Sequence, residues 1–193
     1  VYEDPTADAE FWLDTIRERS GLLALEGIRA GEVVVEVPWE ACLSAQHILK
    51  SKHPLQTLID RARGLLDSTE ILALFLLFEY HKPDSEWSPY LCLLPRKLTS
   101  SLFWDAQALS AASSELRNRT SLLQGKLVHR FRHSIQPLVR NGFESLLPSR
   151  VLTLPNFFWA ISTVRSRNWG FDIGGQHVTV MAPLADMVNH RQG

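Results

Sequence analysis

The chain of 193 residues is 45% hydrophobic and 21% charged, a composition typical of a globular domain with a sizeable core. Its 20 Lys and Arg against 21 Asp and Glu give a net charge of −1, which excludes a global field that would attract nucleic acid or an anionic membrane. The most apolar run, 71–78, is far shorter than the ~20 residues that a membrane-spanning helix needs. Neither nucleic acid nor a membrane is therefore expected as a partner.

The two cysteines and the first residue say little about the compartment. Cys42 and Cys92 lie far apart and form neither a disulfide framework nor a metal-binding pair, which favours a reducing, intracellular location. Because the chain begins with Val1 rather than Met, a targeting peptide cannot be judged. Cytoplasm, nucleus and chloroplast all stay open.

The first elements expected are a short helix over 8–18 and then a β-hairpin. In 32–37 the valines at every second position share one face, which predicts a half-buried strand that Pro38 ends. The segment 30–31 has the residues of a turn, and 22–25 is the expected partner strand.

The pattern from 44 to 81 is helical, and its clearest helix is expected over 68–80. Asp67 and Glu70 have the spacing of a capping box, and Pro83 lies just past the end. Because the helix is apolar on nearly every side, it is expected to be buried and to be core rather than a site.

The second half of the chain is expected to continue with helices and to end in strands. The segment 105–140 is helical in pattern, with Pro137 bending or ending its last turns. A further helix is expected over 157–167. The turn residues of 172–175 then predict a hairpin whose second strand is 177–181.

One local basic stretch, 116–140, contains six Lys or Arg and no acidic residue. A solvated helix face is the simplest interpretation, and docking of an acidic protein partner is the functional alternative. His129 and His133 would share a helix face, but Arg130 and Arg132 would repel a cation there. No metal site is expected.

The strongest signal for chemistry lies near the end of the chain. An apolar stretch after the last strand closes in Asp186, Asn189 and His190, whose groups can pair the hydrogen-bonding edges of an adenine and a charged amino acid moiety. Taken alone, the same residues could form an Asx turn at a helix end.

The tail is the last of five segments that follow one another in a characteristic order along the chain. They are GLLA (21–24), GIRAGEVVVEVP (27–38), SEWSPYLCLLP (85–95), WAISTVRSRN (159–168) and PLADMVNH (183–190). In order and spacing they resemble the SET-domain protein methyltransferases typified by the Rubisco large-subunit lysine methyltransferase and the actin-histidine methyltransferase. The resemblance spans nearly the whole chain.

The resemblance implies an α+β fold in which SET-domain β elements are split by a large helical insertion. The early β part would be 18–43, the insertion 44–160 and the late part 161–193, together one partial SET domain (1–193) that is incomplete at its C-terminus. S-adenosylmethionine is the implied cofactor, and the implied reaction is N-methylation of a lysine in a protein substrate.

Two alternatives to lysine methylation stay open. The first is histidine methylation, although the histidine enzyme has an asparagine two places after its binding arginine and this chain has Trp169 there. The second is a non-catalytic SET-like module that binds a partner protein.

Cofactor-binding residues follow from the resemblance position by position. The family's EGxG loop matches Glu18, Arg19, Ser20 and Gly21, with Arg19 in place of the first glycine. Arg167 matches the arginine that helps bind the cofactor, although Arg165 lies nearer the apolar face of the helix. The segment that holds the adenine and the amino acid moiety matches Asp186, Met187, Val188, Asn189 and His190.

No catalytic residue is assigned. The family's tyrosine lies downstream of the Asn-His pair, whereas the tyrosines here, Tyr2, Tyr80 and Tyr90, all precede it. The chain is thus expected to be an N-terminal fragment that is inactive alone. Trp87, Pro89 and Tyr90 are expected to be structural. The aromatic residues that could line a lysine channel, but are expected to be core, are Phe157, Phe158 and Trp169.

Overall fold

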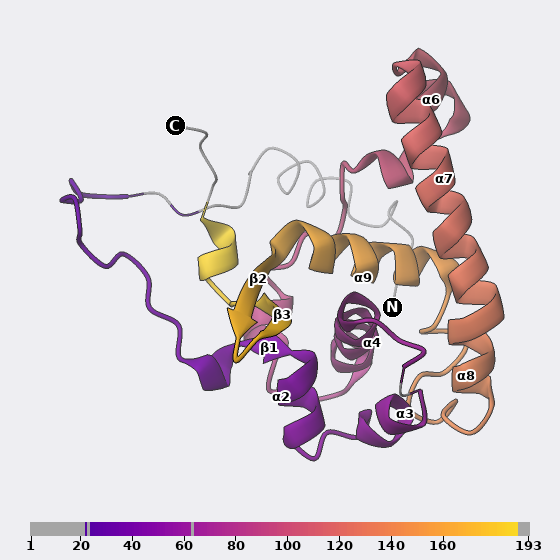
Figure 1. Cartoon of the computed structure of the whole chain (residues 1–193), viewed down its shortest axis with the longest axis horizontal. Helices are drawn as coiled ribbons and strands as arrows, with labels where there is room; N and C mark the ends of the chain where they lie inside the picture. Colours follow the sequence, from indigo (N-terminus) through magenta and orange to yellow (C-terminus); the bar gives the residue numbers. More distant parts are fainter. Residues whose placement is uncertain (1–21, 23, 63, 189–193) are drawn as a thin grey trace.

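A small antiparallel sheet lies beside a larger helical body in the computed structural model, which describes residues 22, 24–62 and 64–188 (Figure 1). The sheet has the order β1-β3-β2. Its strands are β1 (Leu43–Ser44), β2 (Asn168–Ile173) and β3 (Gln176–Met181). Met181 pairs with Leu43 on one side and with Asn168 on the other, so the sheet joins an early segment of the chain to a late one.

The hairpin of β2 and β3 confirms the turn predicted over 172–175. Gly174 and Gly175 have φ values of 58° and 78°, which glycine adopts at little cost and which the tight turns of hairpins require.

Helices make up most of the remaining structure. The α-helices are α2 (Ala45–Lys50), α3 (Gln56–Arg61), α4 (Ser68–His81), α5 (Ser88–Leu91), α6 (Ala106–Ala111), α7 (Ser114–Arg130), α8 (Gln136–Arg140) and α9 (Leu154–Arg167). Short 3₁₀ turns are η1 (Trp39–Ala41), η2 (Ser101–Phe103) and η4 (Ala185–Met187), and η3 (Phe131–Ile135) is a π-helical turn. None of the helices within the described ranges is long and apolar enough to cross a membrane.

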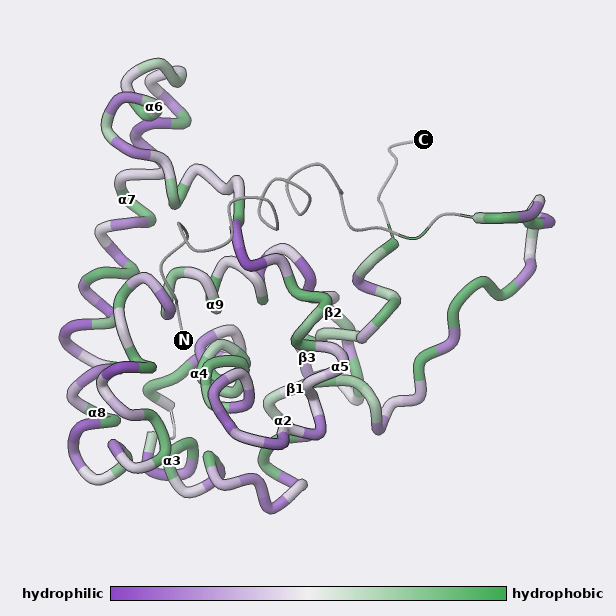
Figure 2. Tube along the Cα trace, turned by 180° about the vertical axis from the view of Figure 1, so that it is seen from behind, coloured by the Kyte–Doolittle hydropathy of each residue, from purple (hydrophilic) through white to green (hydrophobic). Residues whose placement is uncertain are grey.

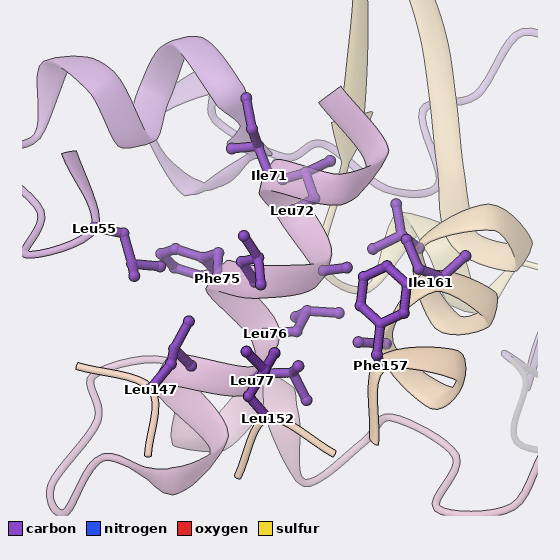
Figure 3. Packing of buried hydrophobic residues seen from close by; sticks show 14 of the residues in the cluster. Leu55, Ile71, Leu72, Phe75, Leu76, Leu77, Leu147, Leu152, Phe157 and Ile161 are labelled. Atoms are coloured by element: carbon purple, nitrogen blue, oxygen red, sulfur yellow. The ribbon is translucent and has the colours of Figure 1, made fainter. Parts of the chain in front are cut away.

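Helix α4 is the centre of the core, as its sequence predicts. The capping box is present, since Glu70 donates its backbone N–H to Asp67 at 2.8 Å and its carboxylate accepts the N–H of Asp67 at 3.1 Å. Figure 3 shows α4 surrounded by apolar side chains, with Phe157 and Ile161 of α9 against it. Burial of each large side chain of this kind contributes about 1.5 to 3 kcal/mol. This packing fixes α9, and therefore the end of α9, relative to the rest of the fold.

Helices α7 and α8 form one rod interrupted by the π-turn η3. The N–H of Gln136 bonds to the carbonyl of Phe131, five residues back, and the next residue is Pro137, which has no N–H to donate. The predicted bend at Pro137 therefore takes the form of a widened turn just before the proline.

The hairpin predicted over 22–37 is wrong. The described part of the chain contains no strand before Leu43, and Val33 and Val34 are 74% and 61% exposed. Figures 1 and 2 show this segment looping away from the body. Alternating valines form a strand only where a partner supplies hydrogen bonds, and here Val37 alone packs against a small apolar cluster. The turn at 30–31 is present, and the helix predicted over 8–18 lies outside the described residues.

Candidate functional site

Three elements from distant parts of the chain meet at the end of α9. Arg167 is the last residue of α9, Asp186 lies in η4 directly after the sheet, and Tyr90 lies in α5. The hairpin β2–β3 carries the chain from Arg167 back to η4, which explains how two polar residues 19 positions apart come into contact.

Asp186 carries a fully buried carboxylate, with 0% of its side chain exposed. Its Oδ2 accepts a hydrogen bond from the Tyr90 hydroxyl at 2.6 Å and lies 3.5 Å from Nη1 of Arg167. Its Oδ1 has no hydrogen-bond partner within the described residues. Burial raises the pKa of Asp186, and the contacts with Tyr90 and Arg167 only partly oppose that rise.

Arg167 is held by one edge of its guanidinium. Nη1 donates to the sulfur of Met187 at 3.1 Å and lies 3.4 Å from the carbonyl oxygen of Asp186. Within the described ranges, Nε and Nη2 make no hydrogen bond, and the side chain is 11% exposed. A guanidinium in this state can bind a carboxylate with two hydrogen bonds.

Tyr90 remains a neutral hydrogen-bond donor. Burial and the negative charge of Asp186 both raise the pKa of the Tyr90 phenol far above its ordinary value. The hydroxyl therefore keeps its proton and donates to Asp186 at any physiological pH.

The backbone around η4 ties the start of the described chain to the same place. Leu22 donates its N–H to the carbonyl of Met187 at 3.2 Å, so the chain that follows the predicted loop Glu18 to Gly21 lies against η4. Leu184, which precedes η4, has a φ of 68°, a strained conformation for a residue with a side chain.

Four of the ten predicted cofactor-binding residues lie in the described part of the chain. Arg167, Asp186 and Met187 are in contact, and Val188 follows them, 45% exposed. Arg165 is exposed, so Arg167 rather than Arg165 reaches η4. The predictions for the other six, which are Glu18, Arg19, Ser20, Gly21, Asn189 and His190, lie outside the described residues.

The remaining candidates have other roles. Phe157 is fully buried, with its ring 5.4 Å from that of Phe131, and belongs to the core as preferred. The rings of His129 and His133 lie 4.5 Å apart, but the described residues contain no group of three or more potential metal ligands. No pattern in the sequence predicts the bond between Tyr90 and Asp186, because the two residues are 96 positions apart. Only the family resemblance pointed to Tyr90, as a structural residue.

Comparison with known proteins identifies relatives over nearly the whole chain, although no family model matches it. The chain is 32% identical to an Arabidopsis thaliana chloroplastic [fructose-bisphosphate aldolase]-lysine N-methyltransferase, covering 91% of this chain and 34% of that protein. It is 28% identical to the Pisum sativum Rubisco large-subunit N-methyltransferase, with 97% and 37% covered. It is 27% identical to the Danio rerio actin-histidine N-methyltransferase, with 91% and 30% covered.

The fold agrees with these relatives. The SET domain of LSMT, solved bound to MeLysine and AdoHcy, superposes with a TM-score of 0.74 at 27% identity over 89% of this chain and 38% of that one. The described structure is likewise a small sheet with a large helical region, as the α+β expectation required. The chain spans about a third of the length of the curated relatives it matches. On this sequence similarity and this fold, the chain belongs to the SET-domain class of protein methyltransferases.

Proposed function

We propose that the chain carries the S-adenosylmethionine-binding part of a protein-lysine N-methyltransferase. The observation that carries the proposal is the contact between Arg167 and the η4 segment, two parts of the chain to which the family resemblance assigns cofactor binding. The Asn-His pair directly follows this segment in the sequence, and the predicted loop 18–21 directly precedes Leu22, whose N–H bonds to the carbonyl of Met187.

The chemistry of the donor set fits the cofactor. An α-amino acid group carries one carboxylate and one ammonium. Among the described residues, the site offers a guanidinium at Arg167 that is bonded along one edge only and a carboxylate oxygen of Asp186 that has no partner. The described polar groups therefore match a zwitterion in both charges.

For methyl transfer, the protein mainly has to align the accepting amine with the methyl group of the cofactor. S-adenosylmethionine supplies an electrophilic methyl group on its sulfonium, so the residues of the site need to bind and orient it and exclude water. The accepting amine must reach the site unprotonated, and an apolar surround favours loss of its proton.

Lysine is preferred over histidine as the acceptor. Trp169 stands two places after Arg167, where the histidine enzyme has an asparagine that holds the target imidazole. A tryptophan side chain offers only one N–H donor and no acceptor, so it cannot substitute for that amide. The protein substrate is therefore proposed to present a lysine, as the name of the Arabidopsis thaliana relative also states for that protein.

Cofactor binding tests the proposal. In the protein at its natural length, Asn189→Ala is expected to weaken binding of S-adenosylhomocysteine by about 1 to 3 kcal/mol, measured by titration calorimetry. Arg165→Ala is the matched control, because this exposed arginine lies on the same helix and the resemblance assigns it no role. No binding by the wild-type protein would refute the proposal.

Mass spectrometry of candidate proteins after incubation with isotopically labelled S-adenosylmethionine separates the possible activities. Label on lysine is expected. Label on histidine would support the histidine alternative, and cofactor binding without any label transfer would support a non-catalytic binding module.

A further inference from the structure

The Tyr90 hydroxyl ends a buried row of polar contacts that leads to Arg167. Tyr90 is 6% exposed and donates to Oδ2 of Asp186 at 2.6 Å, a length typical of a hydrogen bond to a charged acceptor. The same Oδ2 lies 3.5 Å from Nη1 of Arg167. One carboxylate oxygen thus serves a tyrosine from α5 and an arginine from α9.

The distance between Oδ2 of Asp186 and Nη1 of Arg167 reflects the sharing of this oxygen between the two partners. A carboxylate and a guanidinium that bind each other without competition form two parallel bonds of about 2.7 to 2.9 Å. Here the contact is single and long, and Oδ1 stays without a partner in the described part of the chain. Because Oδ2 accepts the hydrogen bond from Tyr90, Asp186 does not contact the guanidinium of Arg167 with both of its oxygens.

We propose that Tyr90 is a positioning residue for the amino acid group of S-adenosylmethionine: it fixes Asp186 so that Oδ1 is left for the ammonium and one edge of Arg167 is left for the carboxylate. The inference rests on the proposed function and extends it to a residue outside the aligned cofactor motifs. Without the hydroxyl, Asp186 would turn both oxygens to Arg167 and the two charges would satisfy each other instead of the ligand.

A pair of ligands separates this role from a purely structural one. S-adenosylhomocysteine carries the amino acid group, whereas 5′-methylthioadenosine has the same adenosine and sulfur without it. In the protein at its natural length, Tyr90→Phe is expected to weaken S-adenosylhomocysteine by about tenfold, as loss of a charge-assisted contact would, and to leave 5′-methylthioadenosine within about twofold. Titration calorimetry, with competition for the weaker ligand, measures both.

Tyr80→Phe is the matched control. It removes a phenolic hydroxyl from a half-buried ring that packs against Trp159, and within the described residues that hydroxyl makes no hydrogen bond. Neither ligand should lose affinity in this variant. Equal loss of both ligands in Tyr90→Phe, or no loss of either, would overturn the inference.

The pH dependence of the wild-type protein is a second measurement that needs no variant. The titratable groups that face Asp186 within the described residues are Tyr90 and Arg167, and the raised pKa of Tyr90 keeps its phenol neutral throughout such an experiment. Because burial raises the pKa of Asp186, acidification should weaken S-adenosylhomocysteine more than 5′-methylthioadenosine. Identical profiles for the two ligands would contradict the role of Asp186, and hence of Tyr90.

The outcomes also separate this inference from the proposed function. A wild-type protein that binds neither ligand refutes both. A wild-type protein that binds S-adenosylhomocysteine, combined with a Tyr90→Phe variant that does not discriminate between the ligands, refutes the role of Tyr90 alone.

Discussion

Glu79 in α4 and Asp186 in η4 are both buried carboxylates, with 2% and 0% of their side chains exposed, yet their surroundings differ. Glu79 has a partner for each oxygen, because His53 lies 2.8 Å from Oε1 and the Ser85 hydroxyl donates to Oε2. Asp186 has both partners on one oxygen and none, within the described residues, on the other. Both oxygens of Glu79 are thus paired, whereas among the described residues one oxygen of Asp186 is left open.

The pKa values of the two carboxyl groups consequently shift in opposite directions. Burial raises the pKa of Glu79, but the hydrogen bonds from His53 and Ser85, together with the nearby Lys82 ammonium, outweigh it and hold the pKa below its ordinary value. Burial raises the pKa of Asp186, and its partners fail to compensate. A buried carboxylate whose two oxygens are both paired needs no further partner, whereas an incompletely paired one is the kind of group that the proposed cofactor site would use.

The largest expected effect is that of removing Glu79. Glu79→Ala leaves His53 and Ser85 without their buried acceptor and should lower the free energy of unfolding by about 3 kcal/mol, measured by denaturant titration. The control is Glu115→Ala, which breaks an ion pair with Arg119 whose side chains are 73% and 78% exposed. That change should stay within about 0.5 kcal/mol, and an equal effect of the two substitutions would contradict the distinction.

Removing Ser85 should convert Glu79 into a group like Asp186. Ser85→Ala leaves Oε2 of Glu79 without its donor and the N–H of Trp87 without its acceptor, at a cost of about 1 to 2 kcal/mol. The variant should also raise the pKa of Glu79. Unfolding measured as a function of pH would detect the rise, and an unchanged profile would show that Ser85 does not stabilise the ionised form.

Acidification should weaken the fold through Glu79. Since its folded-state pKa lies below the unfolded value, its contribution is present above about pH 4.3 and is lost as the pH falls through the folded-state pKa. Glu79→Gln should flatten this part of the stability profile. A profile as steep as that of the wild type would assign the loss to other groups.

The smallest expected effect is a gain in the free energy of unfolding, whereas the changes at Glu79 and Ser85 lower it. Asp186 has a raised folded-state pKa, so its stabilising contribution is present at low pH and is lost as the pH rises through that value. Asp186→Asn, which stays neutral, should therefore raise the free energy of unfolding at neutral pH by up to about 1 kcal/mol while weakening S-adenosylhomocysteine. A less stable variant would show that the ion pair with Arg167 stabilises the fold by more than the burial of the charged carboxylate destabilises it.

The sequence predicts what local signals determine. The capping box of Asp67 and Glu70 and the two glycines of the β2–β3 turn act within a few residues, and both α4 and this hairpin are present. The strand expected at 32–37 fails because its pairing depends on a partner that the sequence of the segment does not specify. At the site, the resemblance pointed to Arg167 and Asp186, but the bond from Tyr90 arises only from tertiary packing.

The π-turn at 131–135 has a consequence for how this rod tolerates insertions and deletions. Leu127, Phe131, Ile135 and Val139 recur every fourth residue and are all buried, whereas an uninterrupted α-helix would rotate a repeat of four by about 40° at each step. The π-turn absorbs part of that rotation, because it contains one more residue than a regular α-helical turn. Deleting a single residue between 132 and 134 would restore regular α-helical bonding and leave Ile135 and Val139 nearly in phase with Leu127 and Phe131, whereas deleting one from a regular part of the rod would turn everything beyond it by about 100°. The π-turn is therefore the place in this rod where the loss of one residue should disturb the buried face least.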